Sequence, residues 1–271
     1  MQSKRYYYLI KLQYLGFRYH GWQKQPQLKT VERMVERTTN YVLRSVLNIE
    51  SRFKLLAAGR TDAMVSVNQT YVELFLENNP LDLEEFFPLF NRNLPQDIRA
   101  LGIEETNAEF NIIQHPQEKE YLYFFSFGEK THPFCAPFMT NVVENLDLEI
   151  MKKAALLFKG KHDFWSYTFR PTPHTQTKGE ILNCEIVENN LFTANFFPEK
   201  SYVLKIKAAG FKRHQIRLIM GILFQLGKGE VEFSFIEKTL NAENKISLDY
   251  VAPASGLILN SVEFLTLKEE K

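Results

Sequence analysis

The sequence predicts an α+β protein in which a few helices cover antiparallel sheets. Hydrophobic residues make up 45% and aromatic residues 14% of the 271 residues, which is typical of a packed, sheet-rich protein. The hydrophobic pattern switches repeatedly between a period of two, typical of strands, and a period of 3.6, typical of helices. In the first 107 residues these segments follow the order β-α-β-β-α-β, the ferredoxin-like arrangement with helices on one face of a sheet.

The first half begins with an aromatic, alternating strand over residues 6–14, followed by a glycine-bracketed loop over residues 16–23. Thr30 then caps a helix that continues to about Leu47, because apolar residues recur there at helical spacing. One stripe of this helix is therefore expected to pack inward.

Two strands, a helix and a third strand complete the first half. A buried strand is predicted over residues 53–57 and an alternating one over residues 67–77. A helix starting at Asp82 is disturbed by Pro88, and a turn at residues 93–97 leads into a strand over residues 98–105.

The second half again combines strands with helices. Strands are predicted over residues 118–127, 178–188, 191–197, 201–209 and 256–267, and helices over residues 148–159, 213–226 and 233–240. The strands at 178–188 and 191–197 are expected to form a hairpin around Asn189-Asn190. The least regular stretch is 106–118, so the predicted lobes are residues 1–107 and 108–271.

Composition excludes several classes of protein. Cys135 and Cys184 are far apart and match no disulfide or metal spacing, so both are expected to be reduced core residues. The six histidines form no i, i+4 pair, and no metal site is expected. The longest apolar stretch, residues 218–226, is about half of a bilayer span, and no signal peptide is evident. A cytoplasmic protein without a membrane segment is the expectation.

The chain is organised around a short polar segment at residues 58–63, Ala-Gly-Arg-Thr-Asp-Ala, which lies between two predicted strands and is called the elbow below. A solvated surface turn is the alternative interpretation of such a segment. Arg217, on the most apolar helix, would be costly to bury unpaired and needs a carboxylate. Asp62 can supply it, and the pairing would also keep a buried Asp62 ionised.

Five further segments accompany the elbow along the chain. They are residues 14–23 (YLGFRYHGWQ), 93–98 (NLPQDI), 119–123 (KEYLY), 211–217 (FKRHQIR) followed by Gly221, and 252–259 (APASGLIL). Together with the elbow, this ordered set resembles the motifs of the TruA-type tRNA pseudouridine synthases. The matches extend over nearly the whole chain.

The resemblance implies an architecture and a substrate. In this family two ferredoxin-like lobes form one continuous, mostly antiparallel sheet, with helices on one face and the catalytic cleft between the lobes. A homodimer binds tRNA across both subunits, and the isomerisation of uridine uses no cofactor and no metal. By analogy we expect the target uridine in the anticodon stem-loop.

The resemblance also implies roles for individual residues. Asp62 would be the catalytic nucleophile or base, and attack on the base and attack on the sugar both remain open. Arg217 would pair with Asp62, and Tyr121 would stack on the uracil and assist removal of the C5 proton. Arg60 would occupy the space that the flipped uridine vacates. The remaining residues expected to contact RNA are Arg18, Tyr19, Trp22, Gln23, Arg213 and His214.

The chain departs from the family pattern beside the elbow. Met64 and Ser66 stand where the family usually has Gly and His, Leu15 stands where Asp is usual, and Glu120 precedes Tyr121 where a basic residue is common. These departures leave three alternatives: a synthase with a different RNA target, a slow or inert RNA-binding paralogue, and a small-molecule enzyme on the same scaffold.

Overall fold

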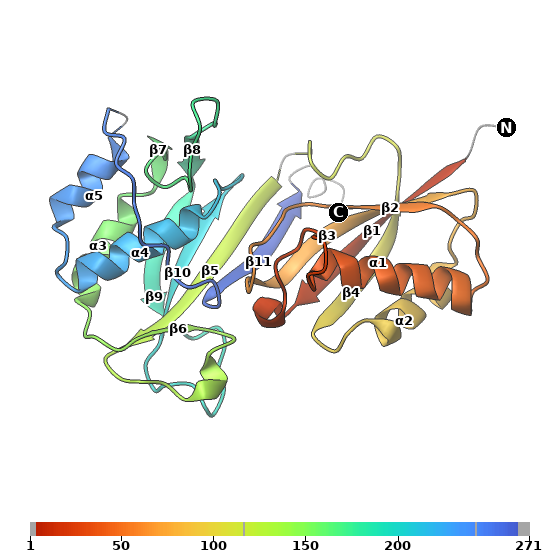
Figure 1. Ribbon diagram of the computed structural model, residues 1–271, viewed down its shortest axis with the longest axis horizontal. Coiled ribbons are helices and arrows are strands. Elements are labelled where there is room, and N and C mark those ends of the chain that lie inside the picture. Colours follow the sequence, from red (N-terminus) through yellow and green to blue (C-terminus); the bar gives the residue numbers. More distant parts are fainter. Residues whose placement is uncertain (1–3, 116, 242, 265–271) are drawn as a thin grey trace. The chain divides into compact units, whose positions relative to one another are not determined.

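The computed structural model describes residues 4–115, 117–241 and 243–264 of the chain (Figure 1). These residues confirm the predicted α+β class, with five α-helices and a larger, mostly antiparallel sheet of nine strands. The chain divides into two compact units, the first made of Met1–Pro116 with Leu259–Lys271 and the second of Gln117–Ile258. The lobe boundary at residue 107 and the cleft between the lobes stay predictions.

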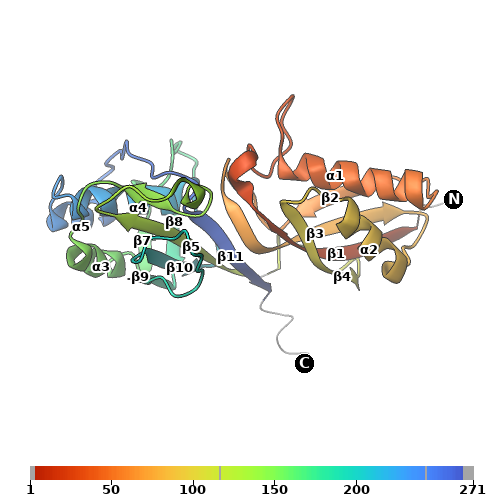
Figure 2. The same ribbon diagram turned by 90° about the horizontal axis from the view of Figure 1, so that it is seen from below.

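The first unit has the predicted β-α-β-β-α-β order. Its elements are β1 (Arg5–Tyr14), α1 (Val31–Tyr41), β2 (Phe53–Ala57), β3 (Ser66–Glu77), α2 (Leu83–Asn93) and β4 (Ile98–Thr106). The strand β1 lies between β4 and β3 and is antiparallel to both, and β2 pairs with β3. Figure 2 shows α1 lying along one face of this sheet.

Buried aromatic and aliphatic side chains account for these elements. In β1, Tyr8, Ile10 and Leu12 are fully buried. In α2, Phe86 and Phe90 lie four residues apart on one helix face, are fully buried, and stack with their ring centroids 5.3 Å apart. Burial of such rings is the main interaction that stabilises a helix packed on a sheet.

The structure corrects details of the first half. The strand β2 is only partly buried, because it lies at the edge of the sheet and pairs with β3 alone. The helix α1 ends at Tyr41, and one π-helical turn, η2 (Val42–Val46), follows it. Thr30 stands at the N-cap position of α1, but its side chain makes no capping hydrogen bond. The helix α2 is capped by the Asp82 carboxylate, as predicted, and continues past Pro88.

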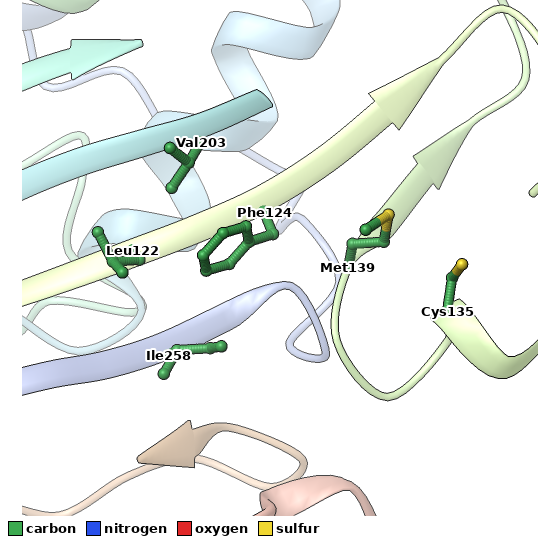
Figure 3. Close-up of a cluster of buried hydrophobic side chains, with 6 residues drawn as sticks. All are labelled: Leu122, Phe124, Cys135, Met139, Val203 and Ile258. Carbon is green, nitrogen blue, oxygen red and sulfur yellow. The ribbon is translucent and has the colours of Figure 1, made fainter. Parts of the chain in front are cut away.

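The second unit contains β5 (Gln117–Phe127), β6 (Thr140–Val142), α3 (Leu148–Leu156), β7 (Gly160–Asp163), β8 (Lys178–Ile181), β9 (Asn183–Glu188), β10 (Tyr202–Ala208), α4 (Gln215–Gly227) and α5 (Phe233–Leu240). Its sheet has the order β5-β10-β9, with the short β6 parallel to β5, and β7 pairs with β8 in a separate ribbon. A hydrophobic cluster from β5, β10, β11 and the loop before β6 packs on this sheet (Figure 3).

The predicted hairpin around Asn189-Asn190 is wrong. Residues 191–197 form no strand, and β9 pairs antiparallel with β10 instead. The helix predicted to start at Arg213 begins at Gln215, because His214 has a left-handed backbone with φ of 57°. Cys135 and Cys184 are buried free thiols, as predicted.

The strand β11 (Leu257–Phe264) contributes to both units, since its first two residues belong to the second unit and the others to the first. Residues 265–267 of the predicted final strand lie outside the described residues. No helix in the described part of the chain is long and apolar enough to cross a membrane.

Candidate functional site

The elbow is held by the loop that follows β1, which we call the opening loop (residues 15–23). The backbone N–H of Trp22 donates to the carbonyl of Thr61 at 3.1 Å, and the N–H of Met64 donates to the carbonyl of Tyr19 at 3.0 Å. The hydroxyls of Tyr14 and Thr61 share a hydrogen bond of 2.8 Å. The backbone on both sides of Asp62 is therefore fixed by main-chain contacts.

Two glycines permit this close approach. A Cβ at Gly21 would lie 2.6 Å from the carbonyl oxygen of Thr61, and the backbone there has a φ of +86°. A Cβ at Gly16 would overlap the carbonyl oxygen of Val65. Any side chain at either position would push the opening loop away from the elbow.

Three residues of the elbow differ in their exposure to solvent. Arg60 is exposed, Thr61 is buried, and Asp62 is half-buried. The half-buried Asp62 side chain is partly shielded from water. The side chain of Arg60, two residues earlier in the elbow, is exposed to solvent.

Met64 closes the elbow in a strained conformation. The N–H of Val65 donates to the carbonyl of Asp62 at 3.3 Å, which makes a turn of residues 62–65. In this turn Met64 has a φ of 67°, in the left-handed region that glycine adopts at no steric cost. Its side chain is 36% exposed. The position thus keeps the backbone geometry that a glycine would adopt.

Ser66 takes part in the same arrangement. Its buried hydroxyl accepts a hydrogen bond of 2.9 Å from the backbone N–H of Gly16. The residue that departs from the family pattern therefore fastens the opening loop to the start of β3.

Asp97, which the sequence analysis missed as a site residue, anchors the opening loop from the other side. One carboxylate oxygen accepts from Nε and a terminal nitrogen of Arg18 at 2.8 and 2.6 Å, and the other accepts from the Tyr19 hydroxyl at 2.6 Å. Burial alone would raise the pKa of Asp97, but the hydrogen bonds from Tyr19 and Arg18 outweigh it and lower the pKa. The turn motif at residues 93–98 was the signal for this residue.

The predicted RNA contacts of the opening loop differ in exposure. Arg18 and Gln23 are exposed, whereas Tyr19 and Trp22 are almost completely buried. Burial, with the hydrogen bond to Asp97, raises the pKa of the Tyr19 hydroxyl. The backbone groups of Tyr19 and Trp22 hydrogen-bond to Met64 and Thr61, and contact of the two residues with RNA stays a prediction.

In the second unit, two tyrosines of β5 have different surroundings. Tyr121 is half-buried, and its ring meets Phe211 edge to face at a centroid distance of 5.2 Å. Tyr123 is fully buried, and its hydroxyl donates to the carbonyl of Pro253 at 2.8 Å. Of the two rings, Tyr121 is the one with surface available to a ligand.

Arg217 is positioned by the segment that precedes β11. Its Nε donates to the carbonyl of Ala252 at 2.7 Å, and the N–H of Ala252 donates back to the carbonyl of Arg217 at 3.0 Å. Gly221, one turn later on α4, leaves room for the carbonyl of Tyr250, which a Cβ would overlap. The segment therefore fixes the direction of the Arg217 guanidinium.

Arg213 and His214 lie in the loop before α4 and meet a residue that sequence reasoning missed. The Arg213 guanidinium lies 5.1 Å from the ring centroid of Phe169, and the His214 ring lies 4.5 Å from it. Arg170 also stacks on Phe169, at 5.1 Å. The adjacent aromatic and basic residues at 169 and 170 were the signal in the sequence.

The predicted site residues thus gather in two groups. Arg18, Tyr19, Trp22, Gln23, Arg60 and Asp62 belong to the opening loop and elbow of the first unit. Tyr121, Arg213, His214 and Arg217 belong to the second unit. The proposed pairing of Asp62 with Arg217 stays a prediction.

Comparison with known proteins agrees with this geometry. Residues 154–264 match the profile of a family described as tRNA pseudouridine synthase. A Bacillus cereus protein named tRNA pseudouridine synthase A 2 is 28% identical over 258 residues, covering 95% of this chain and 99% of its own length. A Thermodesulfovibrio yellowstonii protein named tRNA pseudouridine synthase A is 28% identical over 259 residues, covering 93% and 97%.

A protein of the same name from Acinetobacter baumannii is 27% identical, covering 92% of this chain and 89% of its own length. These relatives align with both units, whereas the family profile lies mainly in the second unit and β11. The ordered motifs, the full-length alignments and the profile match agree, and the chain is similar over nearly its whole length to the TruA-type tRNA pseudouridine synthases.

Proposed function

We propose that this protein is an isomerase that converts uridine to pseudouridine in tRNA. Similarity to the tRNA pseudouridine synthases supports the reaction class, and the names of these relatives support tRNA as the substrate. The observation that carries the proposal is the elbow itself. Its one carboxylate, Asp62, is half-buried on a backbone that hydrogen bonds fix on both sides.

The reaction balances without a co-reactant. The bond between N1 of uracil and C1′ of the ribose breaks, the base turns, and a bond between C5 and C1′ forms. The proton lost from C5 is matched by the proton gained at N1, so nothing is oxidised or reduced. A carboxylate nucleophile and a proton acceptor are sufficient groups for such a sequence.

Asp62 acts as the nucleophile or base in this proposal. Attack of its carboxylate on C1′ of the ribose or on the uracil ring would each give a covalent intermediate that later releases the carboxylate. Arg217 pairs with Asp62 and orients it. Its own orientation is supported by the hydrogen bond from its Nε to Ala252. Tyr121 stacks on the uracil and assists removal of the C5 proton.

The target uridine must leave its stack before Asp62 can reach it, at a cost of a few kcal/mol. Arg60, exposed two residues before Asp62, fills the space that the base vacates. The exposed residues Arg18, Gln23 and Arg213 contact the RNA backbone. We further propose a target in the anticodon stem-loop, a homodimer that binds one tRNA across both subunits, and a cytoplasmic location, all by analogy with the family.

The test uses purified protein and tRNA from a strain that lacks the gene. Chemical mapping and mass spectrometry should detect pseudouridine formed at a defined position by the wild type. Asp62→Asn should lower the single-turnover rate by about 10²–10⁴-fold or more, with little change in tRNA binding. Asp249→Asn, the same change at an exposed residue, should leave the rate unchanged. Full activity of Asp62→Asn would refute the assignment.

A slow or inert RNA-binding paralogue is the second candidate. The observation that favours it is Met64, which places a thioether side chain two residues after Asp62. This candidate predicts that the wild type binds tRNA but forms no pseudouridine at any position in any cellular RNA. A Met64→Gly variant that gains activity would then identify the cause.

A further inference from the structure

A surface cavity of about 420 Å³ lies in the first unit, beside the second half of α1. It is lined by residues of α1 and by the turn after α2, and it includes no residue of the elbow or of the opening loop. Its volume falls within the range of about 300–1,000 Å³ that is typical of small-ligand sites. The cavity is therefore a separate candidate binding site.

The lining combines one exposed aromatic ring with several polar groups. Tyr41 is 50% exposed, although large apolar rings are usually covered in folded proteins. Arg37 and Asn40 are exposed beside it, and Asn93 faces them from the end of α2. Met34 completes an apolar wall.

Some polar groups of the lining already form hydrogen bonds within the protein, and others are open to a ligand. The Thr38 hydroxyl donates to the carbonyl of Asn93 at 3.4 Å, which ties α1 to the turn after α2. The side-chain nitrogen of Asn93 donates to the carbonyl of Leu89 at 2.8 Å, so its amide oxygen faces no donor among the described residues. The cavity thus has a fixed floor and free acceptor and donor groups at its rim.

The charge around the cavity is positive. None of the residues that line it is acidic. Within the described residues Arg37 forms no ion pair, and Arg33 lies one turn earlier on the same side of α1, at i−4. Glu36, the nearest acid in the sequence, is occupied by Lys24, whose Nζ reaches both carboxylate oxygens at 2.6 and 2.8 Å.

The helix changes its geometry at this cavity. The α-helical hydrogen-bond pattern ends at Tyr41, and the π-helical turn η2 begins at the next residue. π-Turns within helices are rare and are frequent at functional sites. Here the change of pitch follows directly after Asn40 and Tyr41.

We propose that this cavity binds one unstacked nucleotide of the RNA substrate, at a distance along the RNA from the uridine that reacts. The inference rests on the proposed function for its choice of RNA. The base stacks on Tyr41, the Arg37 guanidinium binds the adjacent phosphate, and the amides of Asn40 and Asn93 meet the edge of the base. Proteins recognise unpaired RNA bases by this combination of aromatic stacking and edge contacts.

The test measures the dissociation constant for tRNA and, separately, the rate of pseudouridine formation at saturating protein. Tyr41→Leu should weaken binding by about 5- to 100-fold, the range that loss of one base stack gives. Tyr41→Phe, which keeps the ring, should bind like the wild type. The saturated single-turnover rate should stay unchanged in both variants, because Tyr41 does not belong to the elbow.

Arg37→Ala should weaken binding and also reduce the slope of log K against log salt by about 0.7–0.9, since one phosphate contact is lost. Arg52→Ala, which removes an exposed arginine outside the cavity, is the matched control and should change neither quantity. Circular dichroism of each variant checks that the helix is intact.

The outcomes separate this inference from the proposed function. If Tyr41→Leu and Arg37→Ala bind tRNA as tightly as Arg52→Ala while the wild type forms pseudouridine, the nucleotide site is refuted and the enzyme stands. If both weaken binding but no pseudouridine forms in any RNA, the nucleotide site stands and the proposed reaction falls. A wild type that binds free uridine monophosphate at this cavity as tightly as tRNA would also refute the site as an RNA contact.

Discussion

Met64 offers a sharp test of the elbow's geometry, because its backbone is left-handed with a φ of 67°. That conformation costs a non-glycine residue about 1–2 kcal/mol, whereas glycine adopts it freely. Glycine loses about 0.4–1 kcal/mol through the greater freedom of the unfolded chain. Met64→Gly should therefore be more stable than Met64→Ala by roughly 0.5–1 kcal/mol, and both variants lose the same thioether side chain.

At the neighbouring position, residue 63, glycine is expected to lower the stability of the protein. Ala63 is exposed and is not among the described residues with positive φ. Ala63→Gly should therefore destabilise the protein by about 0.5–1 kcal/mol, the usual cost of glycine relative to alanine. The sign of the Ala-to-Gly difference should reverse between two adjacent positions.

The chain allows the first unit to be monitored by itself. It has two tryptophans, and the one in the first unit, Trp22, is buried and donates its backbone N–H to Thr61. In a Trp165→Phe background, urea unfolding followed by tryptophan fluorescence reports on the opening loop and the elbow. If Met64→Ala proves as stable as Met64→Gly, the left-handed strain at the elbow is refuted.

Three further predictions concern buried or paired charges. Burial raises the pKa of the Glu73 carboxyl, whose only described hydrogen bond is a long one of 3.4 Å from Ile112. Stability is therefore lost as pH rises above the ordinary glutamate pKa of about 4.3, and Glu73→Gln should become more stable relative to the wild type between pH 4 and 8 in urea titrations. A stability difference that does not change with pH would contradict this. The pKa of Asp97 is lowered, so its contribution is present above the ordinary aspartate pKa of about 3.9 and is lost as pH falls through its folded value; Asp97→Asn should be destabilised at pH 7 and approach the wild type in acid. An equal loss at both pH values would point to packing instead. Arg217→Lys should lower the single-turnover rate far more than tRNA affinity, because lysine cannot keep the hydrogen bond to Ala252 while pairing with a carboxylate in a two-pronged geometry; near-normal turnover would exclude the proposed pair.

Local patterns predicted the first unit well. The β-α-β-β-α-β order follows from periodicity, and the start of α2 follows from Asp82, whose carboxylate accepts from the N–H groups of Glu84 and Glu85. These features depend on residues that are close in sequence. A single sequence records them directly.

The failed hairpin shows what local patterns miss. Asn189 does make a turn, since its side-chain oxygen accepts from the N–H groups of Leu191 and Phe192. The chain then continues as a loop, in which the ring of Phe192 contacts that of Phe124 in a tilted arrangement with centroids 5.5 Å apart. The strand β9 pairs with β10 instead, because aromatic residues of the loop pack against the hydrophobic cluster of the second unit and do not extend its sheet.

The geometry of the candidate site could not be predicted from the sequence, and the roles of its residues stay predictions. The motifs selected Asp62, Tyr121 and Arg217 by resemblance. They could not show that Met64 and His214 have left-handed backbones, because contacts with distant segments impose those conformations. The cavity beside Tyr41 was also unpredictable, since the hydrophobic pattern of α1 continues through the residue at which the α-helix ends.

The late position of β11 and of the segment before it affects how the nascent chain can fold on the ribosome. A nascent chain that has emerged only as far as α4 already contains Arg217 but lacks Ala252, which orients its side chain. The first unit, although synthesised earlier, still lacks residues 259–264, which hydrogen-bond through Asn260 to Asn68 of β3. Both units therefore depend on the same short stretch of chain, and neither has all its contacts until residues 252–264 have been synthesised.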